Sequence, residues 1–113
     1  MKSTFKLNNE LEINRVGYGA MQLTGTGIWE DAPDRNNAKQ ILREAVNAGV
    51  NFIDTAEAYG PQFNESLIAE ALHPYKKDLV IATKGGFDRP GPGKWTANGS
   101  PEFIKRNIDG SLK

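Results

Sequence analysis

The chain has 113 residues, the size of one small domain, and fourteen basic residues balance fourteen acidic ones. This neutral chain has no basic stripe for phosphates and no apolar run near the ~20 residues that cross a bilayer, so we expect a cytoplasmic protein that binds neither nucleic acid nor membrane. The absence of cysteine and the single histidine, His73, exclude thiolate sites and sites built from several histidines, so we expect no metal.

The N-terminal segment predicts a β-hairpin. Apolar residues alternate from Phe5 to Ile13 on either side of Asn8-Asn9. Asparagine tolerates the positive φ of a tight turn, so two short strands are expected around this pair. Residues 15–19 predict a further short extended segment.

A loop over residues 22–33, carrying an exposed Trp29, leads into the clearest predicted helix. Asp34 is a good N-cap, and Gly49 is placed to end the helix in the left-handed conformation. The apolar residues between them recur with helical spacing, which puts them on one face. They are Ala38, Ile41, Leu42, Ala45 and Val46.

A strand, a helix and a second strand follow. Residues 51–54 are too short for a helix, and their consecutive apolar residues predict a strand covered on both faces. The next helix ends before Pro74, and residues 79–83 predict a second buried strand. Residues 85–99 are rich in glycine and proline, which predicts a long loop. The helical face between the two strands is Leu67, Ile68, Ala71 and Leu72.

A third helix opens at Ser100-Pro101, with serine as the N-cap and proline at the first helical position. Its expected apolar face is Ile104, Ile108 and Leu112. Strands that alternate with helices of this length indicate βαβ units, an α/β fold and a parallel sheet. The short connections fit either a doubly wound sheet or a (β/α)8 barrel, and periodicity does not choose between them.

Three polar residues stand at or just after strand ends, where α/β proteins place their sites. Asp54 ends one predicted strand, Lys84 follows the other, and Tyr59 lies in the loop after Asp54. An ammonium after an apolar strand is costly to desolvate without a partner, and Asp54 is the natural one. A buried lysine beside Tyr59 would lower the pKa of the phenol and make it a usable general acid. The alternative interpretation is an ion pair that only caps the strands.

Four segments carry a family resemblance. Residues 50–60 read VNFIDTAEAYG, Asn64-Glu65 precede a helix, residues 81–84 read IATK, and residues 16–23 read VGYGAMQL. In this order they resemble the aldo-keto reductases, most of all bacterial members of the aryl-alcohol and pyridoxal reductase types. The resemblance covers nearly the whole chain. It implies a (β/α)8 TIM barrel closed at its base by the N-terminal hairpin.

The resemblance also implies NADP(H)-dependent reduction of a small carbonyl compound. It makes Tyr59 the general acid for the carbonyl oxygen and Lys84 the cation that lowers the pKa of the phenol. Asp54 would pair with Lys84 and approach the nicotinamide ribose. The residues expected to face the nicotinamide are Gly19, Ala20 and Met21, and those expected to line the substrate pocket are Trp29 and Trp95.

The length conflicts with a complete barrel, which needs ~250 residues and eight strands. Residues 1–113 are therefore expected to form a partial barrel: the hairpin and three βα units, ending before the strand that carries the family's fourth catalytic position. His73 cannot fill that position, because it ends a helix on the outer side. We expect the isolated chain to be inactive and to self-associate through open sheet edges. The alternative is a non-catalytic nucleotide-binding or interaction module that keeps the half-site.

Overall fold

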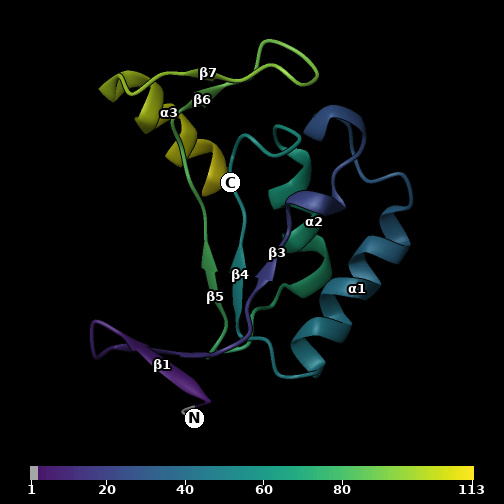
Figure 1. The fold of residues 1–113 in the computed structure, drawn as a ribbon, viewed down its shortest axis with the longest axis vertical. Helices are drawn as coiled ribbons and strands as arrows, with labels where there is room; N and C mark the ends of the chain where they lie inside the picture. The colour runs from purple at the N-terminus through teal and green to yellow at the C-terminus, as the bar shows by residue number, and fades with distance from the viewer. Residues whose placement is uncertain (1–2) are drawn as a thin grey trace.

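The computed structural model describes residues 3–113, and Met1 and Lys2 lie outside the described residues. Figure 1 shows a small parallel sheet with two helices on one side, a hairpin at one end, and a third helix with a second short hairpin at the other end. No helix in this described part of the chain has the length and apolarity that crossing a membrane requires.

The predicted N-terminal hairpin is confirmed. Strands β1 (Thr4–Leu7) and β2 (Leu11–Asn14) pair antiparallel, and both turn asparagines have positive φ, 48° at Asn8 and 59° at Asn9. The hairpin lies at the end of the sheet where the parallel strands begin (Figure 1).

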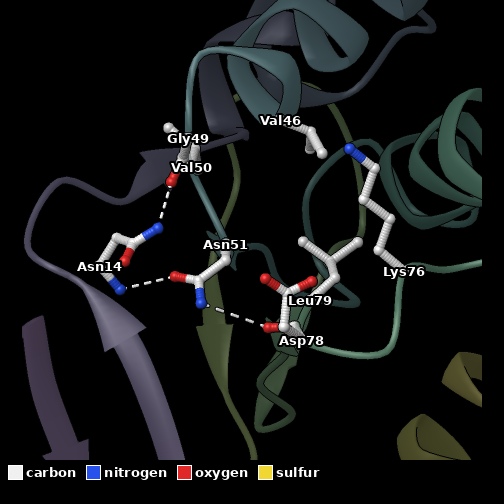
Figure 2. A pocket seen from close by; sticks show the side chains of 8 residues that line it. All are labelled: Asn14, Val46, Gly49, Val50, Asn51, Lys76, Asp78 and Leu79. Carbon is white, nitrogen blue, oxygen red and sulfur yellow. Dashed lines mark hydrogen bonds between the residues drawn. The ribbon is translucent and has the colours of Figure 1, made fainter.

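A buried asparagine fastens the hairpin to the sheet. The side chain of Asn51 accepts a hydrogen bond from the Asn14 backbone N–H at 2.6 Å, and its amide nitrogen donates to the carbonyls of Glu12 and Asp78. Figure 2 shows this asparagine at a pocket of about 80 Å³ below the sheet, whose wall includes Lys76. The pocket lies at the end opposite to the predicted site, so we assign it a structural role only.

The parallel sheet has the strand order β3 (Tyr18–Gly19), β4 (Phe52–Asp54) and β5 (Val80–Ala82). Helices α1 (Arg35–Asn47) and α2 (Phe63–Leu72) connect these strands and lie on the same side of the sheet (Figure 1). The βαβ arrangement predicted from the sequence is therefore confirmed. The core between helices and sheet consists of Ala20, Leu23, Ala38, Leu42, Ile53, Leu67, Ile68 and Ala71.

Both predicted ends of α1 are confirmed. The Asp34 side chain accepts a hydrogen bond from the Asn37 backbone N–H at 2.9 Å, and Gly49, just past the helix, has φ of 109°. An N-cap of this kind satisfies one of the unpaired N–H groups of the first turn.

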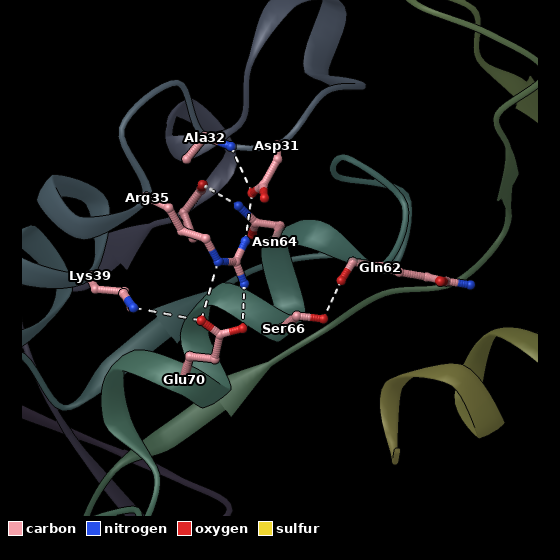
Figure 3. A network of polar contacts seen from close by, with 9 residues as sticks. Asp31, Ala32, Arg35, Lys39, Gln62, Asn64, Ser66 and Glu70 are labelled. Carbon is pink, nitrogen blue, oxygen red and sulfur yellow. Dashed lines mark hydrogen bonds and ion pairs between the residues drawn. The ribbon is translucent and has the colours of Figure 1, made fainter.

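Ion pairs join α1 and α2 on their solvent side (Figure 3). The guanidinium of Arg35 contacts Glu70 at 2.8 Å and Asp31 at 2.6 Å, and the Lys39 ammonium lies 3.7 Å from Glu70. The Glu70 side chain is half exposed, so solvent screens these contacts and each contributes little. The network helps to orient the helices and takes no part in the predicted chemistry.

Two predicted loops are more ordered than the sequence indicates. Residues 22–33 include a 3₁₀ turn (Thr26–Ile28), and Trp29 is half-buried instead of exposed. Residues 85–99 contain a second hairpin of β6 (Phe87–Asp88) and β7 (Thr96–Ala97). Glycine and proline content marks the turns correctly but does not show that the two loops pack against each other.

The strands are less covered than predicted. Ile53 points into the helix layer with 0% exposure, but its neighbour Phe52 is only half-buried, as is every residue of β5. Helices cover one face of the sheet, whereas the other face would form the interior of a barrel. The expectation of strands covered on both faces is therefore wrong for the described residues.

The predicted helix α3 (Pro101–Ser111), its Ser100 N-cap and its first-turn proline are confirmed, but the apolar face predicted for it is largely exposed. Ile108 is 51% exposed and Leu112, just past the helix, is 80% exposed. The helix instead buries Phe103 and Asn107. The Asn107 side chain accepts from the Gly86 N–H and donates to Glu57, so polar contacts decide which face turns inward.

Candidate active site

The predicted site residues meet at the carboxyl ends of the three parallel strands. Gly19 of β3 and Asp54 of β4 are register partners, and Lys84 follows β5 by two residues. Parallel strands end at the same edge of a sheet, which brings side chains that are far apart in sequence to one place. The site is thus a product of the topology and not of any one loop.

The predicted pair of Asp54 and Lys84 is confirmed. The Lys84 Nζ lies 2.8 Å from Asp54 Oδ2 and donates a second hydrogen bond, also of 2.8 Å, to the Thr55 carbonyl. However, 49% of the Lys84 side chain and 42% of the Asp54 side chain are exposed. The expectation of a buried lysine is therefore wrong, because the described residues cover only one face of the sheet.

Lys84 remains a cation at neutral pH. Partial burial lowers the pKa of its ammonium, but the hydrogen bond and charge of Asp54, with a contribution from Tyr59, outweigh burial and raise the pKa above its ordinary value. A positive charge is thereby kept beside the tyrosine through the physiological pH range.

Tyr59 lies next to this cation. The Lys84 Nζ is 5.2 Å from the centroid of the tyrosine ring, and the loop that carries the ring is fixed by a hydrogen bond from the Glu57 N–H to the Lys84 carbonyl. The structure thus brings together all three residues that the sequence singled out for catalysis. A phenol hydroxyl and an ammonium are thereby held side by side at the edge of the sheet.

The sequence did not predict a pair of buried hydrogen bonds below the site, made by Thr55 and Asn64. The Thr55 hydroxyl donates to the Asn64 side-chain oxygen at 2.6 Å, and the Asn64 amide donates to the Ala20 carbonyl at 2.9 Å. Both side chains are almost completely buried. They fasten the ends of β3 and β4 to the start of α2, which makes the edge that carries Asp54 rigid.

The three residues expected to face a nicotinamide differ in accessibility. Gly19 is exposed, and no described atom lies within 4 Å of the place where its Cβ would stand. Met21 is half-buried. Ala20 belongs to the core with 0% exposure, and its N–H donates to the Asp54 carbonyl, so it supports the site from below instead of lining it.

The two tryptophans expected in the substrate pocket lie near the site. The Trp95 ring meets the Tyr59 ring edge to face, with centroids 6.3 Å apart, and meets the Phe87 ring at 5.7 Å. Arg89 joins the tryptophans, since its Cζ lies 3.6 Å from the Trp95 centroid and 5.7 Å from that of Trp29. The sequence gives no signal for Arg89, because an arginine in a proline-rich loop is usually a solvated charge.

Glu57 also borders the site. Burial first, and then the nearby charge of Glu65, raise the pKa of the Glu57 carboxyl above its ordinary value, although Arg106 acts in the opposite direction. His73, by contrast, is the C-cap of α2 and packs its ring against Tyr75. Its predicted position at a helix end is confirmed.

Comparison with known proteins gives a consistent result. The model of the Aldo/keto reductase family matches residues 15–113. An uncharacterized oxidoreductase of Schizosaccharomyces pombe is 43% identical over 104 residues, which are 92% of this chain and 34% of that protein. The pyridoxine 4-dehydrogenase of Escherichia coli is 42% identical over 111 residues, 98% of this chain and 38% of that protein.

Solved structures agree with the sequence comparisons. An aldo-keto reductase of Bacillus halodurans, in its holo form, superposes with a TM-score of 0.78 at 29% identity over 97% of this chain and 35% of the other. The chain therefore spans about a third of the length of its relatives. Its fold is the N-terminal portion of a (β/α)8 barrel, as predicted.

Proposed function

The chain belongs to the aldo/keto reductase family, and from this we propose that the protein is an NADP(H)-dependent oxidoreductase that reduces an aldehyde or ketone to an alcohol. One observation carries the proposal: the Asp54–Lys84 ion pair stands beside Tyr59 at the carboxyl ends of adjacent strands. This arrangement supplies a proton donor next to a cation, which carbonyl reduction needs.

In the proposed mechanism Tyr59 donates its phenolic proton to the carbonyl oxygen of the substrate. Lys84 stabilises the phenolate left behind, and Asp54 holds the Lys84 ammonium by the 2.8 Å contact. The Tyr59 phenolate then takes a proton from solvent and returns to the neutral phenol. When bound, NADPH would supply the hydride for the carbonyl carbon, so the substrate gains one hydride and one proton, which together are two electrons and two protons.

The residues present fit the nicotinamide end of such a cofactor. A side chain at Gly19 would stand in the open space beside Asp54, and glycine leaves this space free. The exposed Asp54 carboxylate offers acceptors for ribose hydroxyl groups, while the half-buried Met21 lies at the end of β3. The preference for NADP(H) over NAD(H) rests on the family resemblance.

The aromatic rings near Tyr59 favour a substrate with a flat, apolar group. The Trp95 ring meets the Tyr59 ring edge to face and also meets the Phe87 ring, and Arg89 contacts the rings of both Trp95 and Trp29. Aromatic side chains bind apolar rings well without losing much conformational freedom. The Escherichia coli relative carries the name of a dehydrogenase that acts on pyridoxine, a ring alcohol, and agrees with this substrate class.

Residues 1–113 alone should be inactive and should self-associate through the sheet edge. Strand β5 has a neighbour only on its β4 side among residues 3–113, and α3 leaves Ile108 and Leu112 exposed. An unpaired strand next to an apolar surface favours pairing with a second copy. Light scattering after size-exclusion chromatography tests this proposal, and a well-folded, active monomer would contradict it. The expected cytoplasmic location stays a prediction.

NADPH titration followed by a turnover assay tests the proposed function. At its natural length, the protein should bind NADPH, detected by cofactor fluorescence, and consume it when an aromatic aldehyde is added. Binding without turnover would favour the alternative of a non-catalytic nucleotide-binding module. Failure to bind would leave an interaction module as the interpretation.

A further inference from the structure

Arg89 is buried although it lies in a loop rich in glycine and proline. Only 7% of the residue is exposed, and its guanidinium donates four hydrogen bonds to backbone carbonyls. Nη1 donates to Ala58 at 2.6 Å and to Ile28 at 2.9 Å, Nη2 donates to Gly27 at 2.9 Å, and Nε donates to Lys94 at 2.7 Å. One side chain thus holds three separate segments of the chain.

Each of these segments carries an aromatic residue of the candidate site. The carbonyl of Ala58 directly precedes Tyr59, that of Ile28 directly precedes Trp29, and that of Lys94 directly precedes Trp95. The planar guanidinium also lies over the Trp95 ring, with its Cζ 3.6 Å from the centroid. Stacking of this kind adds to the hydrogen bonds and fixes the plane of the ring.

The backbone under Arg89 is held in an uncommon conformation. Ile28 has φ of 53° and Gly27 has φ of 70°, and a β-branched residue in the left-handed region is a true outlier. Two of the four carbonyls that Arg89 binds belong to these residues; that of Ile28 also accepts from the Gly60 N–H, and that of Gly27 from the Gly93 N–H. Such a conformation persists only where the surroundings enforce it, and it concentrates at functional sites.

The hydrogen-bond donors of Arg89 are already used within the protein, so the guanidinium is unsuited to bind a substrate anion. Four of its five N–H donors are directed at carbonyls, and within residues 3–113 no carboxylate forms an ion pair with it. Arg89 can then act on a substrate only through the residues that it holds in place.

We propose that Arg89 is a positioning residue that fixes Trp29, Trp95 and the Tyr59 loop as the wall of the substrate pocket, and thereby sets the preference for aromatic carbonyl substrates. This inference rests on the proposed reductase function. Arg89 acts on substrate binding more than on the chemical step, because Tyr59 keeps its separate contact with Lys84.

The test substitutes Arg89→Lys in the protein at its natural length, labelled with 5-fluorotryptophan. Lysine keeps the charge but lacks the planar fork that reaches all three segments. The fluorine resonances of the two tryptophans are assigned with Trp29→Phe and Trp95→Phe. Arg43→Lys is the matched control, since Arg43 donates to the Ala71 carbonyl and joins α1 to the end of α2.

In Arg89→Lys both tryptophan resonances should shift, and KM for an aromatic aldehyde should rise about tenfold while kcat changes less than about threefold. KM for propanal, which is too small to reach the ring wall, should change less than about twofold. Arg43→Lys should show none of these effects. Unmoved resonances, or shifted resonances with an unchanged KM ratio between the two aldehydes, would overturn the proposal.

Trp95→Phe keeps the proposal falsifiable if Arg89→Lys does not fold. Trp95 is an exposed residue, so this variant should keep the fold, and the Trp29 resonance should still move because Arg89 contacts both rings. An unmoved Trp29 resonance would overturn the proposal. A parent protein without reductase activity would refute the proposed function instead, and the fluorine spectra alone would then decide whether Arg89 fixes the rings.

Discussion

Replacing Lys84 by methionine separates what the Asp54–Lys84 pair contributes to folding from what it contributes to catalysis. Both side chains are about half exposed, so we treat the pair as a surface ion pair, which contributes about 0.2–1 kcal/mol to the free energy of unfolding. The hydrogen bond from Nζ to the Thr55 carbonyl adds about 0.5–1.5 kcal/mol. We therefore expect Lys84→Met to lower the free energy of unfolding by only about 1–2 kcal/mol.

The expected effect on catalysis is larger. Lys84→Met removes the cation that lies 5.2 Å from the centroid of the Tyr59 ring. Loss of effective general-acid catalysis should lower the rate by about 100-fold or more, equivalent to about 2.7 kcal/mol.

The pH dependence of stability has a definite sign. The pKa of Lys84 is raised in the folded state, so its contribution is fully present below the pKa of about 10.4 in the unfolded chain. That contribution is lost only as pH rises through the higher folded value. The stability difference between Lys84→Met and the parent should therefore stay constant from about pH 6 to 9.

Urea unfolding and NADPH-dependent aldehyde reduction, measured side by side, check this prediction. Lys77→Met, at an exposed lysine between α2 and β5, is the matched control and should leave both quantities unchanged. A loss of about 3–5 kcal/mol in stability would mean that the pair behaves as a buried one. A rate within about threefold of the parent would mean that Lys84 is only a solvated strand end.

Three further predictions follow from the site. Tyr59→Phe should lower turnover by about 10²–10⁴-fold while the Kd for NADPH stays within a few-fold, measured by steady-state kinetics and fluorescence titration; retained turnover would refute the assignment. Asn64→Ala removes a buried amide with two hydrogen-bond partners and should lower the free energy of unfolding, measured with urea, by about 2–3 kcal/mol. Asn36→Ala, at an exposed position, should change this free energy little. Glu57→Gln should raise the urea midpoint at pH 8 and not at pH 4. Burial raises the pKa of Glu57 in the folded state, so its carboxyl reduces stability as pH rises from the unfolded pKa through the folded pKa; an equal midpoint at pH 8 would contradict this.

The meeting of Asp54 and Lys84 at one edge of the sheet could be predicted because the topology follows from simple patterns. Strand ends can be read from apolar runs, and parallel strands joined by helices end at one edge, so Asp54 and Lys84 had to approach each other. The ends of α1 could also be predicted, from Asp34 and Gly49, because helix capping depends on local sequence.

Contacts between loops could not be predicted in this way. The burial of Arg89 depends on three segments that meet only in the folded chain, and nothing local marks it. The exposure of the apolar face of α3 could not be predicted for a similar reason. Periodicity identifies an apolar stripe on a helix but does not show whether another part of the chain covers it. Hydrogen bonds of Asn107 with Gly86 and Glu57 determine the face that turns inward, and such pairings are not encoded in spacing.

Deuterium transfer from labelled cofactor tests the central claim most directly. The protein at its natural length is incubated with an aromatic aldehyde and NADPH that carries deuterium at the transferable position, and the alcohol product is analysed by mass spectrometry. We predict one deuterium on the former carbonyl carbon, formed by the parent protein at a rate that Tyr59→Phe reduces by about 100-fold or more. Absence of labelled alcohol from the parent protein, or equal labelling rates with Tyr59→Phe, would contradict it.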